Sequence, residues 1–478
     1  MADMLAQDGH QVDVIMNNKV KDHIITKHAG VISFTVPEEV RGVSDLSMDD
    51  LNMNGLAFYS LINRIHTVQT SFCEGLFRDD LAMNSIRNAG YDLILADVLS
   101  LCNAPLSSHL NITTILYQNY GFFPYSGCLY PLFPSFTCHA QGTFCDSDDM
   151  TFMQKVLNTV FLVVQNYLII PAFTPNIEKI AENTGIDLKV PIDQVYKEKI
   201  VLLNADYVLD SPRPTMPHVF MTSGLFHKKP APLTDEFQKI IDASHPHGVI
   251  LMSFGTLVPK FDAKTAEKFA KVLGDLKQQV IWRYTGEKPK GLKDNTHLTE
   301  WFPQNDLLAN PATKLFITHC GISSTFESAY NGVPVVAMPL FVDQTTNAKK
   351  LTERAKMGVL LDYYTVTEDQ FKAGIQEVLT NPIYRENAKM TSLTMSDQLV
   401  PPVQRFRHLV NFTIKTGGAR HLFHPYATRM SWFTYFSLDV ISFLSLIVSF
   451  VFLAMFIMLR TIYKCCCAAK QQTKVKKQ

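Results

Sequence analysis

Short apolar runs alternate with amphipathic stretches along most of the chain, a pattern typical of α/β proteins. In the second half, six runs predict strands with helices between them: GVILMSFGT, QVIWRY, THLTEWF, KLFITHC, VPVVAMP and GVLLDYY. In the first half, HQVDVIM, DLILADV and NITTILY predict strands and residues 54–77 predict a helix. The pattern breaks at the proline-rich residues 211–217, which we interpret as a linker. We expect two doubly wound domains facing a cleft, with ligands at the carboxyl ends of the strands.

The last apolar run is longer than the others. Residues 440–459 are twenty consecutive uncharged residues, enough to cross a hydrocarbon core of about 30 Å. Aromatic residues precede this run, and six basic residues with no acidic one follow it. We therefore predict a transmembrane helix rather than a buried core helix, with the tail in the cytosol and the bulk of the chain on the other side.

Composition sets limits on the class of protein. The chain has 478 residues, 47% hydrophobic and 18% charged, and its 44 basic residues balance 44 acidic ones. These values exclude a disordered scaffold and a nucleic-acid binder that works by bulk positive charge. The zero net charge divides into +6 for residues 460–478 and −6 for the rest. We expect domains at 1–225 and 226–430, a membrane segment with its aromatic flank at 431–459, and a basic tail at 460–478.

Two features of the tail bear on location. Lys474 and Lys476 have the spacing of a dilysine signal for retrieval to the endoplasmic reticulum. Three consecutive cysteines, Cys465 to Cys467, follow the membrane segment. They are either palmitoylated or remain free thiols in the cytosol.

A lumenal body would carry sequons and disulfides. Asn111 and Asn411 each begin an N-glycosylation sequon, although Asn111 leads directly into an apolar run that reads as a strand. Cys138 and Cys145 are close enough in sequence for a local disulfide, with zinc as the alternative. No CxxC pair supports a zinc site, so we expect a disulfide or buried thiols and no bound metal.

The first residues, MADMLAQDGH, contain no apolar core of a signal peptide. They resemble the end of an amphipathic helix, with Ala2 and Leu5 on one face and Gly9 as its stop. A helix that enters a parallel sheet normally follows a strand. The sequence is therefore expected to begin in the middle of a βαβ motif.

The richest group of polar residues lies between Trp301 and Gln344. A strand ends at Thr318, a turn follows, and hydroxyl residues open a helix whose free N–H groups form an anion site. His319 lies at the mouth of this site as a donor to phosphate, and Glu327, one turn further, is placed to accept both hydroxyls of a ribose. This pattern predicts a site for a nucleoside diphosphate joined to a polyhydroxylated group. No GxGxxG or Walker loop supports a dinucleotide or ATP site, and a soluble NAD-type oxidoreductase has no support.

The stretch from Trp301 to Gln344 resembles the signature of UDP-glycosyltransferases, most closely the animal membrane-bound UDP-glucuronosyltransferases. Ser253-Phe254-Gly255-Thr256, Trp282-Arg283 and the terminal helix with its basic tail support the resemblance. It implies a GT-B fold, no cofactor beyond the UDP-sugar co-substrate, and inverting transfer of glucuronate or glucose to a small lipophilic acceptor. Membrane lipid is an implied partner, nucleic acid is not, and assembly of several copies is left open.

The resemblance also assigns residues. It implies that Trp301 stacks on uracil with Gln304 beside it, that Glu327 binds the ribose, and that Asp343 and Gln344 bind the sugar. His319, Gly321 and Ser323 would lie at the diphosphate, with Ser253, Thr256 and Arg283 lining the same site. Each has a structural alternative: a core His319 or Trp301, a surface Glu327, a strand-end cap at Asp97. The aromatic residues 122–136 are either ordinary packing or the wall of an acceptor pocket.

The chain departs from the family pattern in three ways. Cys320 replaces the first glycine of a His-Gly-Gly motif. A residue with a side chain is tolerated at this position if its φ stays negative. Ser323 stands where vertebrate relatives often have Asn. Asp97 matches the aspartate that holds the family's catalytic histidine, but that histidine falls upstream of Met1, and His10 is not its equivalent. The leading hypothesis is a glycosyltransferase, and the alternative is a catalytically impaired protein that binds UDP-sugars or a partner.

Overall fold

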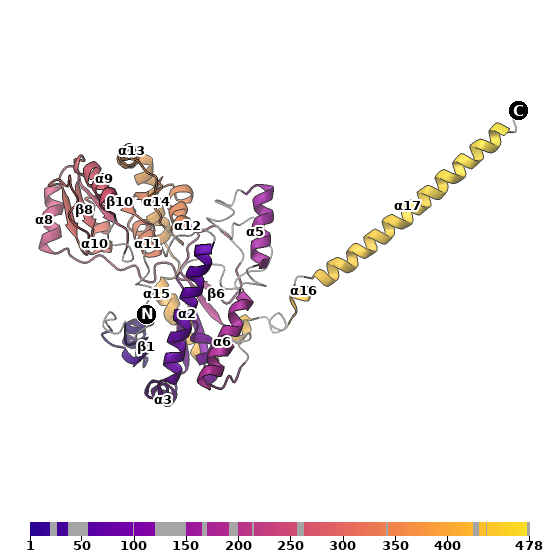
Figure 1. Ribbon diagram of the computed structural model, residues 1–478, viewed down its shortest axis with the longest axis horizontal. Helices are drawn as coiled ribbons and strands as arrows, with labels where there is room; N and C mark the ends of the chain where they lie inside the picture. Colours follow the sequence, from indigo (N-terminus) through magenta and orange to yellow (C-terminus); the bar gives the residue numbers. More distant parts are fainter. Residues whose placement is uncertain are drawn as a thin grey trace. The chain divides into compact units, whose positions relative to one another are not determined.

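The computed structural model describes residues 1–19, 26–36, 56–98, 100–119, 150–164, 170–190, 199–212, 215–255, 262–340, 343–423, 430–435 and 437–475. The chain forms two compact units, Met1–Arg420 and His421–Gln478. Figure 1 labels many of their helices and strands.

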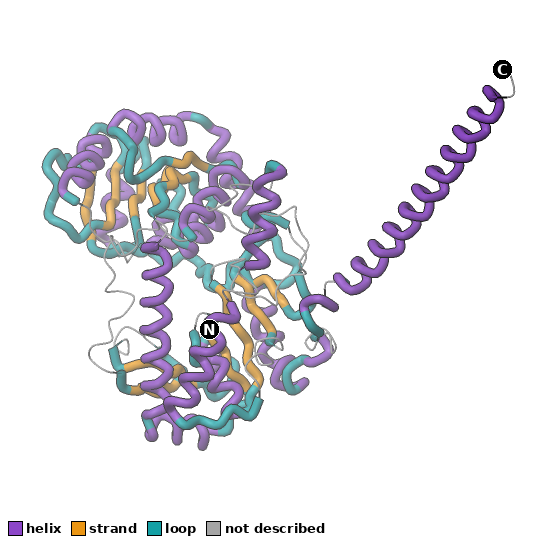
Figure 2. Tube along the Cα trace, turned by 45° about the vertical axis from the view of Figure 1, so that its right-hand side comes forward, coloured by secondary structure: helices purple, strands orange, loops and turns teal. Residues whose placement is uncertain are grey.

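A parallel six-stranded sheet forms the centre of the second half of the first unit (Figure 2). Its spatial order is β12-β11-β10-β7-β8-β9. The strands are β7 (Val249–Ser253), β8 (Gln279–Arg283), β9 (Thr296–Thr299), β10 (Thr313–Thr318), β11 (Val335–Ala337) and β12 (Gly358–Leu360). All six strands expected from the apolar runs are present.

Helices cover both faces of this sheet because successive side chains of a strand point to opposite faces. On one face, Met252 and Trp282 pack with Phe269 of α9 and Phe371 of α13. On the other face, Leu251 and its neighbours pack against five helices. The helices of this half are α8 (Asp235–Ala243), α9 (Ala263–Gly274), α10 (Gln304–Ala309), α11 (Ile322–Tyr330), α12 (Gln344–Lys349), α13 (Glu368–Thr380) and α14 (Pro382–Ser396), with a π-helical turn η4 (Lys350–Arg354).

The first half contains two parallel sheets. One pairs β1 with β2, and the other has the order β3-β4-β5-β6. The strands are β1 (Asp13–Asn17), β2 (Gly30–Phe34), β3 (Leu93–Asp97), β4 (Thr113–Gln118), β5 (Ile200–Leu203) and β6 (Val219–Met221). The helices are α1 (Ala2–Gln7), α2 (Leu56–Arg78), α3 (Asp80–Ala89), α4 (Asn103–Leu110), α5 (Phe152–Val164) and α6 (Ile170–Thr184).

The predictions for the first half were correct but incomplete. Helix α1 buries Leu5 and is followed by Gly9 at φ 92°, as the sequence indicated. Strands β2, β5 and β6 were not predicted. Strand β6 has three residues, too few for a period-two pattern to be recognised, and β2 is mostly exposed.

Helix α15 (Pro402–Thr416) connects to the first half, although it lies within the range 226–430 assigned to the second domain. The Arg405 guanidinium donates to the carbonyl of Met221 at the end of β6, at 2.8 Å. Arg407 pairs with Asp8 beside α1, at 2.6 Å. The return of the chain to the first half was not visible in the sequence, and the predicted domain boundaries remain predictions.

A disulfide joins α2 to the start of α4. It links Cys73 to Cys102, and both cysteines belong to a buried cluster with residues of α3 and α6. This pair was not predicted, since the two cysteines are separated by 29 positions. The expected pair of Cys138 and Cys145 lies outside the described residues.

The second unit contains η5 (Arg420–Leu422) at its start, α16 (Trp432–Tyr435) and the single long helix α17 (Leu438–Val475). Residues Leu438–Lys464 of α17 are long and apolar enough to cross a membrane. The span predicted at 440–459 falls within this segment. Its side chains are exposed within the protein, as expected for a helix whose apolar surface contacts lipid.

Candidate functional site

The expected donor-binding residues gather at one edge of the six-stranded sheet. Thr318 of β10 lies in register with Ser253 of β7, and Arg283 of β8 with Thr299 of β9. Because all these strands are parallel, their carboxyl ends meet at the same edge. His319 directly follows the end of β10, and Trp301 lies two residues after the end of β9.

An open helix N-terminus lies at the middle of this edge. Helix α11 begins at Ile322, one residue before the predicted start, and Gly321 at its N-cap provides no side-chain cap. Ser323 in the first turn is exposed. The backbone N–H groups of this turn therefore point to a place where an anion is favoured by hydrogen bonding and by the helix dipole.

His319 lies against two glycines beside this N-terminus. A Cβ atom added to Gly255 or Gly321 would lie 2.5 or 2.7 Å from the His319 Nε2 atom, so a side chain at either position would displace the His319 ring. Gly255 also has φ 78°, in the left-handed region. Burial lowers the pKa of His319 to about 4, with the backbone of Ser253 opposing and Arg283 adding to the shift. The imidazole is therefore neutral at pH 7.

One nitrogen of this ring lacks an internal partner. Within the described part of the chain, the buried Nδ1 atom of His319 has no hydrogen-bond partner. A neutral imidazole carries one N–H donor and one acceptor nitrogen. An unsatisfied buried ring nitrogen at a helix N-terminus is poised to interact with a bound oxyanion or its water.

Gln304 and Glu327 are brought together across the chain. The Gln304 amide donates to the Glu327 carboxylate at 2.7 Å and to the Ser324 hydroxyl at 3.1 Å. Glu327 is largely enclosed, and desolvation raises its pKa although the bond from Gln304 opposes this. The bond fixes the carboxylate one turn into α11, where two oxygens are available to a vicinal diol.

Two flat side chains, those of Trp301 and Arg283, lie at the same edge of the sheet. Trp301 is 65% exposed, which is high for an indole, and its own carbonyl accepts a bond from the Thr299 hydroxyl at 2.7 Å. This exposure contradicts the alternative in which Trp301 is a core residue. The Arg283 Nε atom donates to the carbonyl of Glu300 at 3.0 Å, which holds the guanidinium at the same edge.

Asp343 and Gln344 lie at the start of α12. The Asp343 carboxylate accepts a bond from the Asn347 amide at 2.7 Å, and burial raises the pKa of Asp343. The Gln344 side-chain oxygen accepts a bond from the backbone N–H of Leu340 at 2.8 Å. Gln344 is thus partly committed to holding the chain between β11 and α12.

The backbone of Cys320 does not have the negative φ that the sequence analysis required for a side chain at this position. Its φ is 61°, in the left-handed region, rather than negative. The turn from β10 into α11 imposes this conformation, which costs an L-residue roughly 1–2 kcal/mol. Packing compensates for the strain: the side chain is fully buried in the core beside α11, and burial raises the pKa of the thiol.

The remaining predicted residues lie elsewhere. Asp97 is exposed at the carboxyl end of β3, in register with Tyr117 of β4. Asn111 is exposed in the turn before β4, and Asn411 is exposed on α15. Thr256 lies outside the described residues, as does the aromatic segment 122–136.

Sequence reasoning overlooked two supporting residues. Ser324 is buried and accepts the second bond from Gln304, and Asn347 orients Asp343. The spacing of four residues between Asp343 and Asn347 was a readable signal, because such pairs face each other on a helix. The role of Ser324 could not be predicted from the sequence, because nothing in the sequence shows that Ser324 is buried while its neighbour Ser323 is exposed.

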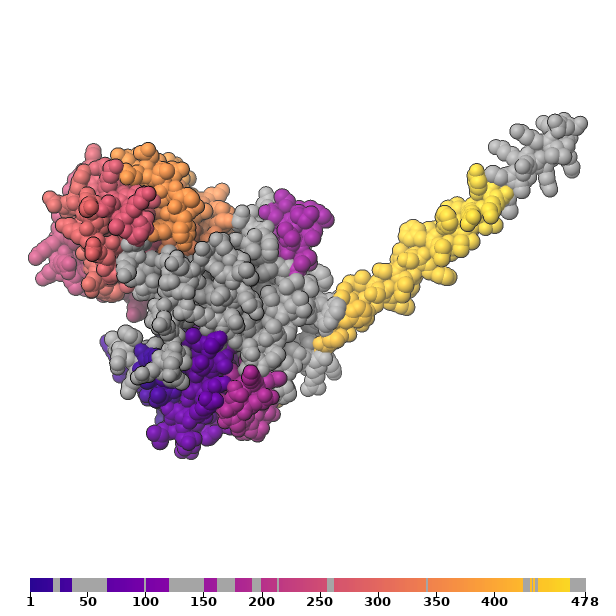
Figure 3. Space-filling view, viewed as in Figure 1, coloured from indigo at the N-terminus to yellow at the C-terminus, as the bar shows by residue number. Residues whose placement is uncertain are grey.

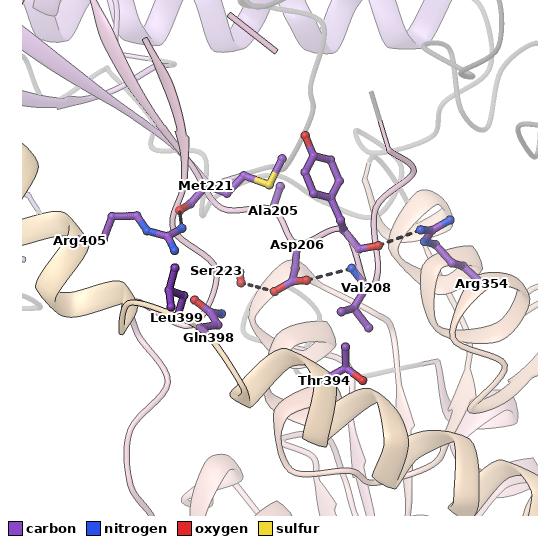
Figure 4. A pocket seen from close by; sticks show the side chains of 11 residues that line it. Ala205, Asp206, Val208, Met221, Ser223, Arg354, Thr394, Gln398, Leu399 and Arg405 are labelled. Carbon is purple, nitrogen blue, oxygen red and sulfur yellow. Dashed lines mark hydrogen bonds between the residues drawn. The ribbon is translucent and has the colours of Figure 1, made fainter. Parts of the chain in front are cut away.

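A separate cavity of about 660 Å³ lies beside the segment that follows β5 (Figure 4). Asp206 in its wall accepts bonds from the Ser223 hydroxyl and the Val208 N–H, and Arg354 donates to the carbonyl of Tyr207. None of the residues expected to bind the donor lines this cavity. The Ser223 hydroxyl also contacts the Tyr330 hydroxyl at 3.1 Å, so the cavity wall is joined to the last residue of α11.

Comparison with known proteins agrees with this arrangement. Residues 2–475 match the family model described as UDP-glucoronosyl and UDP-glucosyl transferase. The chain is 33% identical to human UDP-glucuronosyltransferase 1A3 over 92% of this chain and 84% of that protein. It is 31% identical to mouse UDP-glucuronosyltransferase 1A1 over 97% of this chain and 86% of that protein.

Solved structures support the fold. The kitacinnamycin glycotransferase aligns with a TM-score of 0.59 at 15% identity, covering 86% of this chain and 94% of that one. The glycosyltransferase VinC, solved in complex with DTDP, aligns with a TM-score of 0.59 at 14% identity over 87% and 95%. The fold is that of GT-B glycosyltransferases, with one apolar helix added at the C-terminus. The chain belongs to the UDP-glucuronosyl and UDP-glucosyl transferase family, enzymes that transfer a sugar from a UDP-sugar.

Proposed function

We propose that this enzyme transfers glucuronate from UDP-glucuronate to a hydroxyl group of a small lipophilic acceptor, with inversion at the anomeric carbon. The observation that carries the proposal is the Gln304–Glu327 pair, fixed at 2.7 Å beside the open N-terminus of α11 and His319. The preference for glucuronate over glucose follows the names of the relatives, which are glucuronosyltransferases.

Each part of the donor has a matching group. The exposed Trp301 indole stacks on the uracil with Gln304 beside it, while the Glu327 carboxylate accepts bonds from the ribose hydroxyls. The N–H groups of α11, the Ser323 hydroxyl and His319 bind the diphosphate, whose charge increases as the bond to the sugar breaks. Asp343 and the amide group of Gln344 bind sugar hydroxyls, and no metal or further cofactor is required.

Asp97 contributes from the first half. In an inverting transfer, the acceptor oxygen attacks C1 opposite the departing UDP and loses its proton to a base. We assign Asp97 to stabilising the positive charge that this base acquires, in the manner of the carboxylate of a catalytic triad. Its exposure at the carboxyl end of β3 leaves it accessible to such a partner.

We place the enzyme in the membrane of the endoplasmic reticulum, with its first unit in the lumen and the basic tail in the cytosol. The buried Cys73–Cys102 disulfide supports an oxidising compartment for the first unit. The exposed sequon residues Asn111 and Asn411 are compatible with glycosylation there. The basic residues after α17 support a cytosolic tail.

The test uses the full chain in lipid vesicles with labelled UDP-glucuronate or UDP-glucose and a panel of phenols. Labelled glycoside should form with UDP-glucuronate. Glu327→Ala should raise the KM for the donor about ten- to hundredfold, since a charged group that binds hydroxyls is lost. Glu386→Ala, on the exposed side of α14, is the matched control. Transfer from UDP-glucose alone would refute the donor assignment, and binding of either donor without transfer to any phenol would refute the activity.

A further inference from the structure

The segment between β6 and α8, residues 222–234, leads the chain from the first half of the unit into the second. Figure 3 shows the two halves as separate areas of the surface, indigo for the start of the first half and orange for the end of the second. The Phe226 ring packs edge-on against Tyr117 of β4, with the ring centroids 5.6 Å apart. Because Tyr117 lies in register with Asp97 of β3, the connecting segment passes close to the part of the four-stranded sheet that carries Asp97.

Two further contacts fasten the connecting segment to helices of the donor site. The His227 ring stacks on Tyr330 of α11, with the ring centroids 4.7 Å apart. The Ala231 N–H donates to the carboxylate of Asp306 on α10 at 3.0 Å. The residues between these two contacts are therefore held along α10 and α11.

Lys228 lies between these contacts. The Asn305 amide donates to the backbone carbonyl of Lys228 at 3.0 Å. Asn305 directly follows Gln304, whose amide holds the Glu327 carboxylate at 2.7 Å. The backbone of Lys228 is thus fixed beside the Gln304–Glu327 pair by a bond that does not involve the lysine side chain.

The Lys228 side chain is exposed, and no described residue forms an ion pair or a hydrogen bond with it. Its charge nevertheless reaches the donor site. Burial raises the pKa of Glu327, and the Lys228 ammonium is among the groups that oppose this rise. A second cation, Arg283, acts on His319, where burial lowers the pKa and the Arg283 charge adds to the shift. One cation is therefore near the residue assigned to the ribose, and the other is near the residue assigned to the diphosphate.

We propose that Lys228 binds the phosphate next to the ribose of the UDP-sugar, as a cation supplied by the segment that joins the two halves. The inference rests on the proposed donor site. This phosphate is bonded directly to the ribose that Glu327 is assigned to bind, so a lysine fixed beside the Gln304–Glu327 pair is placed to meet it. The N-terminus of α11 supplies only about half an elementary charge, which leaves most of the diphosphate charge to be offset. A flexible ammonium group on a fixed backbone supplies a further positive charge.

Binding of uridine, UMP and UDP to the full chain in lipid vesicles, measured by titration calorimetry, tests the proposal. The three ligands share the uracil and the ribose and differ only in their phosphates. Lys228→Gln should weaken the binding of UMP and of UDP about fivefold, as expected for the loss of one exposed charge pair, and should leave uridine binding unchanged. Lys228→Arg keeps the charge and should bind UDP within about twofold of the parent chain. Lys229→Gln, at the exposed neighbouring lysine, is the matched control and should bind all three ligands as the parent does.

Salt provides a second measurement. The difference between the parent chain and Lys228→Gln should shrink as salt rises, because the screening length falls from about 10 Å at 0.1 M to about 3 Å at 1 M. A difference that does not depend on salt would contradict a charge contact.

The other outcomes separate the possible failures. Unchanged UMP and UDP binding in Lys228→Gln would overturn the proposal and leave the donor site intact. Equal weakening of uridine and UMP would show that Lys228 acts through Glu327, and weakening of UDP alone would place the lysine at the second phosphate; either result would overturn the assignment. A parent chain that binds none of the three ligands would refute the proposed donor site itself, and the inference with it.

Discussion

The two halves of the first unit use the same parallel α/β design with different completeness. In the second half, every residue of β7 is buried and six strands form one sheet between two layers of helices. In the first half, β5 is buried at all four residues but no residue of β3 is, and the described strands are divided between a sheet of two and a sheet of four. The second half is thus positioned by packing on both faces of its sheet, which fixes the site at the sheet edge.

The first half depends more on specific links. The Cys73–Cys102 disulfide joins two of its helices, and Arg407 of α15 pairs with Asp8. Functional groups differ in the same way. Glu327 and Asp343 in the second half are largely enclosed, whereas the side chain of Asp97 in the first half is exposed. A preformed donor site beside a less enclosed region is consistent with an enzyme that binds one fixed donor.

The largest effect is expected where the preformed site is broken. His319→Ala should lower kcat/KM about 10²- to 10³-fold, or about 2.7–4 kcal/mol, because a donor to the developing diphosphate charge is lost. His247→Ala, at an exposed histidine of the same half, is the control and should leave the rate unchanged. Steady-state kinetics with varied UDP-sugar measures both variants. A change of less than threefold for His319→Ala would show that the site does not act on the diphosphate.

The dependence of the first half on its disulfide can be tested next. Replacing Cys73 and Cys102 by Ala should lower the free energy of unfolding by about 3–4 kcal/mol, as expected for a crosslink that closes a loop of 29 positions. Denaturant unfolding in detergent, followed by protease protection of the first half, measures the loss. Cys465→Ala in the tail serves as control. Equal stability of the double variant and the control would show that packing alone maintains this half.

Cys320 tests how precisely packing fixes the turn into α11. Both Cys320→Ala and Cys320→Gly remove the buried sulfur, but only Gly removes the strain of φ 61°. The relief of roughly 1–2 kcal/mol exceeds the roughly 0.8 kcal/mol lost with the methyl group, so Gly should be more stable than Ala by up to about 1 kcal/mol. Thermal unfolding of the two variants makes the comparison. Greater stability of the Ala variant would mean that the turn relaxes away from the left-handed conformation.

The last effect concerns the dependence of stability on pH. The pKa of His319 is about 4 in the folded enzyme and near 6.5 in an unfolded chain, so the unfolded chain binds the extra proton between these values. The stability of the parent enzyme should therefore fall below pH 6.5 and continue to fall until about pH 4. His319→Gln should show a shallower fall over this range, as measured by the midpoint of thermal unfolding at each pH. Parallel curves for the two proteins would contradict a buried, neutral His319.

The sequence alone predicted the main features of the second half and of the membrane segment. All six strands of the larger sheet were recognisable, because its central strands are buried on both faces and appear as continuous apolar runs. The residues from Trp301 to Gln344 also indicated a site for a nucleoside diphosphate before any contact was known. Twenty uncharged residues followed by a basic tail indicated α17, since length and charge alone determine whether a helix can cross a bilayer.

Only the tertiary structure decided which groups meet. The bond between Gln304 and Glu327, the approach of His319 to Gly255 and the pairing of Cys73 with Cys102 join positions far apart in the chain. The left-handed conformation of Cys320 follows from the path of β10 into α11, which its residue type does not favour. Local pattern determined the elements, and long-range packing determined the contacts between them.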